Sequence, residues 1–160
     1  MNRQSLTSLA GALAFAVLPG LATAQQTSLV GSWSVAAVVD QYESGKRINN
    51  WGTVKGNISF EAGGRFSQII IGDAQPALKS ADPRKPDAPV VAYYGSYTVN
   101  EAGKTISFKL EAASYSPRVG MPITSSFTID GDSMTLVGSP RKDQEGTFTP
   151  RLELKRARQP

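Results

Sequence analysis

The feature that most constrains the fold of this chain is an alternation of apolar and polar residues with a period of two. In the clearest segment, Ile106, Phe108 and Leu110 alternate with Ser107 and Lys109. Because neighbouring side chains of a β-strand point to opposite faces of a sheet, this spacing predicts strands with one buried face. No segment after residue 28 has the 3.6-residue spacing of an amphipathic helix, so we predict an all-β fold.

Eight such segments follow one another along the chain. The predicted strands cover residues 33–39, 54–60, 66–70, 91–99, 105–112, 123–129, 134–136 and 148–154. In the first strand the residues predicted to face inward are Trp33, Val35, Ala37 and Val39, and in the fifth the inward series ends at Ala112. Eight sequential antiparallel strands leave no open edge when they close on themselves, so we predict an eight-stranded antiparallel up-and-down β-barrel. A sandwich of two sheets is the alternative.

The connections between the predicted strands differ in length in a regular way. Three are short turns that contain glycine, at residues 61–65, 100–104 and 130–132, and are typical of hairpins. The other four are longer and cover residues 40–53, 72–89, 114–120 and 138–147. In an up-and-down barrel the three short turns lie at one end, so we expect a closed base and an open rim. Trp51, in the first long loop, either covers the opening or packs on the outside.

Residues 1–24 are typical of a secretory signal peptide. Arg3 precedes an apolar stretch over residues 6–21, and Ala22 and Ala24 occupy the small-residue positions of a cleavage site. We therefore expect residues 25–160 to form a single exported domain, periplasmic or secreted, without stable membrane insertion after cleavage. The alternative is a permanent membrane anchor, which usually needs about 20 apolar residues and has no such site.

Composition excludes several kinds of chemistry. The chain has no His and no Cys, so a Ser-His-Asp triad, a thiol nucleophile and the commonest zinc ligands are excluded. We see no glycine-rich phosphate loop, and a hairpin turn accounts for Asp130 and Asp132, so we expect no cofactor and no metal. The net charge of +4 is small, which together with export argues against a nucleic-acid partner. We identify no catalytic residue and predict no oligomeric state.

A resemblance to a known family begins at Gly31-Ser32-Trp33, a G-x-W motif at the start of the first predicted strand. Further matching segments are Gly64-Arg65-Phe66-Ser67, Tyr93-Tyr94-Gly95-Ser96-Tyr97 and Arg151-Leu152-Glu153-Leu154-Lys155-Arg156. Over residues 29–156 the chain resembles a bacterial, exported member of the lipocalin-like domain family, which has a β-barrel of the calycin type. The resemblance implies the same barrel that the alternation predicts.

The first and last predicted strands also suggest how the base is closed. Arg156 has the same strand parity as Leu152 and Leu154, so it points inward near the base. We predict that its planar guanidinium stacks on the Trp33 indole and bonds to open carbonyl groups there. This is a structural role.

The predicted lumen is apolar with a few polar side chains, which is typical of sites for small hydrophobic molecules. The residues that we predict to bind such a ligand are Phe60, Gln68, Tyr93, Tyr97, Phe108, Ser125 and Phe127. The alternative is that these side chains fill the barrel completely. The long loops mix cations with acids (Arg118, Arg141 and Lys142 against Glu43, Asp143 and Glu145, for example), and this mixture does not favour a specific anion site.

These patterns favour a non-enzymatic carrier whose partner is a small hydrophobic molecule. One alternative is an enzyme, a cyclase or isomerase that uses Tyr93, Tyr97 or an inward carboxyl group on a hydrophobic substrate. That alternative rests on analogy with other calycin-type barrels. The other alternative is a filled structural barrel with no ligand.

Overall fold

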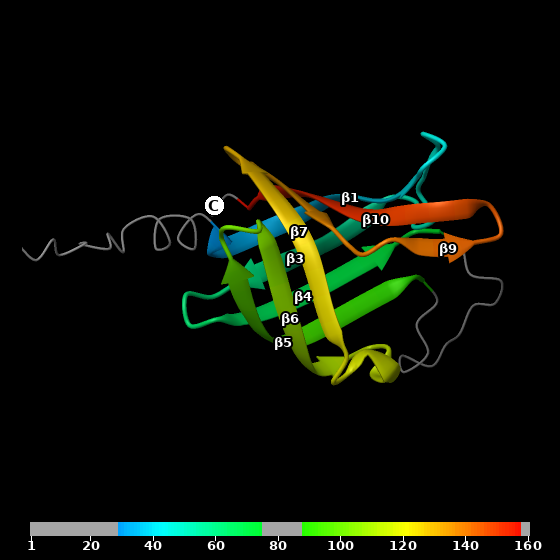
Figure 1. Ribbon diagram of the computed structural model, residues 1–160. Coiled ribbons are helices and arrows are strands. Elements are labelled where there is room, and N and C mark those ends of the chain that lie inside the picture. Colours follow the sequence, from blue (N-terminus) through cyan, green and yellow to red (C-terminus); the bar gives the residue numbers. More distant parts are fainter. Residues whose placement is uncertain (1–28, 75–87, 158–160) are drawn as a thin grey trace, which may run out of the picture.

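The computed structural model describes residues 29–74 and 88–157, and the predicted signal peptide lies outside these ranges. Within them the regular elements are ten β-strands and one 3₁₀ helix (Figure 1). The elements are β1 (Gly31–Tyr42), β2 (Arg47–Ile48), β3 (Val54–Phe60), β4 (Arg65–Gly72), β5 (Val90–Asn100), β6 (Thr105–Ala113), the 3₁₀ helix η1 (Ser116–Arg118), β7 (Pro122–Asp130), β8 (Ser133–Val137), β9 (Arg141–Asp143) and β10 (Gly146–Arg156).

Eight of these strands form a closed antiparallel barrel in the order β1-β3-β4-β5-β6-β7-β8-β10. The barrel closes because β1 pairs with β10, from Trp33 opposite Arg156 to Tyr42 opposite Phe148. The prediction of an eight-stranded up-and-down barrel is therefore confirmed. The two remaining strands are short additions in the long connections, where β2 pairs with β1 and β9 pairs with β10.

The short turns form the base of the barrel, as the sequence predicted. They connect β3 to β4, β5 to β6 and β7 to β8. Gly64 and Gly131 have φ of 77° and 54°, a backbone conformation that glycine adopts without strain. Backbone hydrogen bonds join each turn to a neighbouring strand, for example from the amide of Phe127 to the carbonyl of Lys104 at 2.9 Å. At the opposite end, η1, β2 and β9 lie within the long connections.

A β-bulge in β1 changes which of its residues face inward. The pairing with β10 shifts between Val35 and Ala37, so one extra residue is inserted and the alternation reverses. Beyond this point Val38 and Asp40 line the interior. The prediction that Ala37 and Val39 face inward is therefore wrong.

A second bulge has the same effect in β6. Gly95 pairs with Leu110 but Tyr94 pairs with Ala112, which leaves Glu111 as the extra residue. Ala113 packs against the core and Ala112 is exposed. The prediction of an inward Ala112 is wrong for the same reason as in β1.

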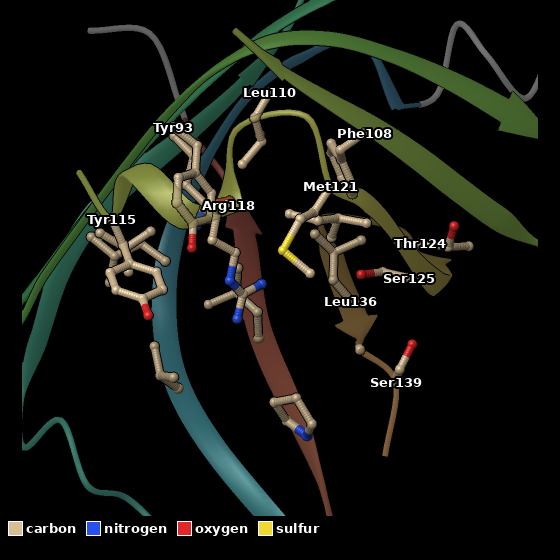
Figure 2. A pocket seen from close by; sticks show the side chains of 18 of the residues that line it. Tyr93, Phe108, Leu110, Tyr115, Arg118, Met121, Thr124, Ser125, Leu136 and Ser139 are labelled. Carbon is tan, nitrogen blue, oxygen red and sulfur yellow. The ribbon is translucent and has the colours of Figure 1, made fainter. Parts of the chain in front are cut away.

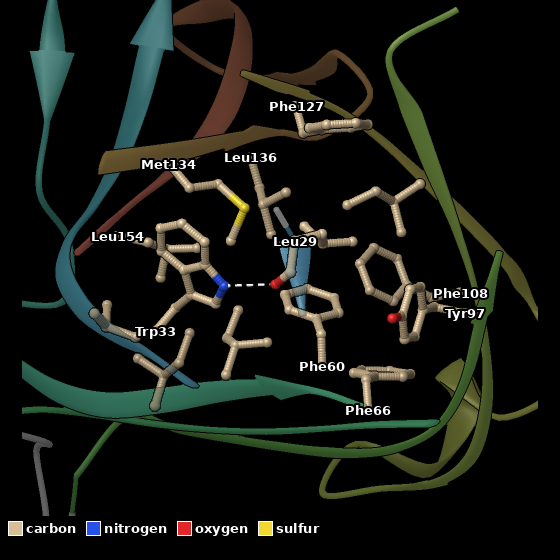
Figure 3. Packing of buried hydrophobic residues seen from close by; sticks show 14 of the residues in the cluster. Leu29, Trp33, Phe60, Phe66, Tyr97, Phe108, Phe127, Met134, Leu136 and Leu154 are labelled. Carbon is tan, nitrogen blue, oxygen red and sulfur yellow. Dashed lines mark hydrogen bonds between the residues drawn. The ribbon is translucent and has the colours of Figure 1, made fainter. Parts of the chain in front are cut away.

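The base is closed by Trp33, which is fully buried (Figure 3). Its indole Nε1 donates a hydrogen bond to the carbonyl of Leu29 at 2.8 Å. The Arg156 guanidinium carbon lies 4.1 Å from the centroid of the Trp33 ring, and Arg156 Nη1 donates to the carbonyl of Val30 at 3.2 Å. The predicted stacking of Arg156 on Trp33 is confirmed. The sequence did not predict a role for Leu29, which is also fully buried and lies two residues before the start of β1.

Above this plug, side chains fill the lower half of the barrel. Phe60 packs edge-on against Tyr97 with a centroid distance of 5.1 Å, and the ring of Phe66 is tilted against that of Phe108 with a centroid distance of 4.8 Å (Figure 3). Other fully buried residues of this core are Ile58, Ile106, Phe127, Met134 and Leu154. The lower half is therefore a conventional hydrophobic core.

Candidate functional site

The upper half of the barrel contains a cavity of about 740 Å³. The aromatic rings of Phe66 and Phe108, together with Leu136, belong to the core and also line the cavity, so they form its floor. The walls are mostly apolar and come from six barrel strands, with Val38, Ile70, Val91, Leu110, Ile123 and Leu152 among them. The barrel is thus filled in its lower half and hollow in its upper half. The sequence-based alternative of a filled barrel describes the lower half, and the prediction of a ligand-binding lumen describes the upper half.

Three of the neutral polar side chains that line the cavity lie deep enough to face its apolar walls: Gln68 from β4, Tyr93 from β5 and Ser125 from β7. Tyr115, Thr124 and Ser139 also line it and are more exposed or lie in the loops. Gln68 and Tyr93 are direct cross-strand partners, so their side chains lie side by side on the inner face. Within the described ranges the side chains of Gln68, Tyr93 and Ser125 make no hydrogen bond to another residue. Their amide and hydroxyl groups are therefore available to a ligand or to water.

Loops at the rim complete the cavity (Figure 2). Tyr115, Arg118 and Met121 line it from the connection between β6 and β7, and Arg141 lines it from β9. Trp51 also lines the cavity and packs against the core. Of the two positions considered for Trp51, the structure supports the one at the opening.

The predicted ligand-binding residues divide into two groups by their height in the barrel. Gln68, Tyr93, Phe108 and Ser125 line the cavity. The other three, Phe60, Tyr97 and Phe127, lie in the filled core below it, where each is at most 4% exposed. All seven face inward as predicted, but the cavity brings together only the first group.

Tyr97 illustrates the difference between the two halves. Its hydroxyl donates a hydrogen bond to the backbone carbonyl of Glu61 at 2.9 Å, in the turn between β3 and β4. Burial raises the pKa of the Tyr97 phenol, so the group remains a neutral donor. Tyr97 therefore satisfies a carbonyl at the base and does not extend into the cavity.

Sequence reasoning missed several lining residues. Unbroken alternation from Trp33 predicts Val38 on the outer face, and the bulge in β1 turns its side chain inward. Tyr115, Arg118 and Met121 lie in a loop, where strand parity makes no prediction. The signal that could have indicated them is their position in a long connection at the open end of the barrel.

No helix among the described residues is long and apolar enough to cross a membrane. Comparison with known proteins gives no family assignment, since no family model, no curated protein and no solved structure matches the chain.

Proposed function

We propose that this protein is an exported, lipocalin-like carrier that binds a small hydrophobic molecule in the upper half of its barrel. Residues 1–24 direct the chain to export, and residues 25–160 form the carrier. The ligand enters between the rim loops and lies on the aromatic floor of Phe66 and Phe108. Binding requires no covalent chemistry, because contact with the apolar walls supplies the free energy.

The observation that carries this proposal is the combination of a hollow upper half with polar side chains that make no hydrogen bond to a described residue. The volume of 740 Å³ lies in the range of about 300–1,000 Å³ that is usual for small-molecule sites. A filled structural barrel would bury its polar groups against one another, whereas the side chains of Gln68, Tyr93 and Ser125 make no hydrogen bond to a described residue. They are placed to orient a carbonyl or hydroxyl group of the ligand.

Blocking the cavity with a large side chain tests the proposal. Ser125 lines the cavity, and Ser126, the next residue of β7, is exposed on the outer face. Ser125→Trp places an indole in the cavity, whereas Ser126→Trp adds the same side chain outside. With a neutral environment-sensitive dye, we expect Ser125→Trp to weaken binding at least tenfold, about 1.4 kcal/mol, and Ser126→Trp to leave it unchanged.

Circular dichroism and urea unfolding of both variants establish that each is folded. Equal binding of the dye to both variants would place it outside the cavity and contradict the proposal. A folded parent that binds neither the dye nor any apolar ligand of this size would favour the structural barrel.

A further inference from the structure

The loop between β6 and β7 has an unusual distribution of side chains. In residues 114–122 the only residue that is not exposed is Arg118, the last residue of η1. The apolar side chains of Tyr115, Val119 and Met121 are instead 62%, 44% and 55% exposed. A solvated loop usually has the opposite arrangement, with its charged groups in water. The Arg118 side chain extends from the loop into the cavity (Figure 2).

Arg118 has no acidic partner within the described ranges. Its contacts are made by the backbone, whose amide donates to the carbonyl of Tyr115 at 3.0 Å and whose carbonyl accepts from Met121. The guanidinium group itself makes no side-chain hydrogen bond or ion pair to a described residue. It therefore presents its donors to the cavity without a counter-charge from the described part of the chain.

Three acidic residues of β9, β10 and the turn between them bind other side chains. Glu145 forms an ion pair with Lys46, and Glu153 forms one with Arg47. Asp143 accepts a hydrogen bond from the Tyr42 hydroxyl at 2.7 Å. In the sequence analysis the mixture of cations and acids in the long loops did not favour an anion site. The pairings show that these three acids do not neutralise the positive residues that line the cavity.

The charges that face the cavity itself are therefore mainly positive. Asp40 is the only acidic side chain among the described residues that line it, and its carboxylate accepts a hydrogen bond from Asn50 at 3.3 Å. The positive residues that line it are Arg118, Arg151 of β10 and the exposed Arg141 of β9. Arg141 shares a face with its cross-strand partner Phe148. A partly buried guanidinium without a counter-charge favours binding of an anion, and its planar set of donors matches a carboxylate or phosphate group.

We propose that the ligand is an amphiphilic anion whose apolar body lies in the barrel and whose acidic headgroup binds Arg118 at the rim. This inference rests on the proposed carrier function and specifies the chemical class of its ligand. The floor and walls contact the hydrocarbon part of the ligand, and its charged headgroup remains at the opening. Arg141 adds a second, more solvated positive charge beside the headgroup.

Ligands of equal chain length and different headgroup test this assignment. Displacement of a neutral apolar dye from the parent protein is measured with dodecanoate, dodecyl phosphate, dodecan-1-ol and dodecyltrimethylammonium, all as monomers in low salt. We expect the two anions to bind at least tenfold more tightly than the alcohol, and the cation to bind most weakly. The order of the two anions identifies whether the headgroup is a carboxylate or a phosphate.

The same titrations with variants assign the preference to Arg118. Arg118→Gln should bring the affinities for the two anions to within about twofold of the affinity for the alcohol. Arg118→Lys should keep part of the preference for the anions. The matched control is Lys55→Gln, which removes one positive charge from the exposed side of β3 and should keep all of it. The preference should also decrease in high salt, because the site is partly solvated.

The outcomes separate this inference from the carrier function. Equal affinity of the parent for the anions and the alcohol overturns the anion site and leaves the carrier intact. An Arg118→Gln variant that loses affinity for the anions and the alcohol alike overturns the role of the charge, since packing alone would then explain it. Failure of the dye and all four amphiphiles to bind would instead overturn the carrier function.

Discussion

Replacing Trp33 tests whether the plug at the base stabilises the barrel. The indole is fully buried, its Nε1 bonds to the Leu29 carbonyl, and one face lies against Arg156. Trp33→Ala removes these contacts and leaves a cavity, so we expect a loss of about 3–5 kcal/mol in the free energy of unfolding. This is a large fraction of the roughly 5–15 kcal/mol that stabilises an ordinary domain.

The contribution of the stacked pair can be separated by a double-mutant cycle. Arg156 is about one-third exposed, with 32% of its side chain accessible, so its interaction with the ring should be worth about 0.5–1 kcal/mol. We therefore expect Arg156→Ala to destabilise less than Trp33→Ala, and the double variant to lose less than the sum of the two. Trp33→Phe keeps a ring but removes the hydrogen bond to Leu29, and it should lie between the parent and Trp33→Ala.

Urea unfolding at constant pH measures the stability of the parent and of these four variants. The control is Lys109→Ala, which truncates an exposed side chain of β6 and should change stability by no more than about 0.5 kcal/mol. A Trp33→Ala protein as stable as the parent would refute the idea that this residue closes the barrel. Strict additivity of Trp33→Ala and Arg156→Ala would show that the stacked pair contributes no interaction energy.

Two further predictions concern pH and processing. The hydrogen bond from Tyr42 lowers the pKa of Asp143, and the same contact raises the pKa of Tyr42 to about 12, so Tyr42→Phe should be less stable than the parent. The stabilisation from Asp143 is lost as pH falls through its lowered pKa, and the stabilisation from Tyr42 is lost as pH rises from about 10 through 12. The difference in stability between the parent and Tyr42→Phe should therefore be largest near neutral pH. A difference in urea midpoints that stays constant from pH 2 to pH 12 would contradict this. Exported protein should begin at Gln25, and N-terminal sequences that start within residues 6–21 would exclude cleavage after Ala24.

Strand positions could be predicted because one face of each strand is buried and the other is not. The two bulges could not be predicted, because the side chains of the inserted residues do not distinguish a bulged strand from an unbroken one. Ala36 and Glu111 are both exposed and fit an unbroken strand as well as a bulged one. One extra residue reverses every orientation that follows it, which is why Val38 lines the cavity and Val39 does not.

The candidate site could be predicted only in part. Alternation predicts whether a side chain faces inward or outward, but not how far the residue lies from the base of the barrel. Phe60 and Tyr93 both face inward, but Phe60 ends β3 beside a base turn and Tyr93 lies near the rim end of β5. Distance from the short turns would have separated these two. The orientation of Arg118 had no such signal, since it depends on the path of the loop through η1.

The same strands thus serve stability at one end and binding at the other. In β7, Phe127 is buried in the core near the base, and Ser125 lines the cavity one inward position higher. The upper half can remain hollow because closure does not depend on filling it: β1 and β10 stay paired from Trp33 and Arg156 at the base to Tyr42 and Phe148 beside the rim. The backbone hydrogen bonds of the barrel therefore hold the walls of the cavity in place, while the plug and the core supply the apolar burial that stabilises the fold.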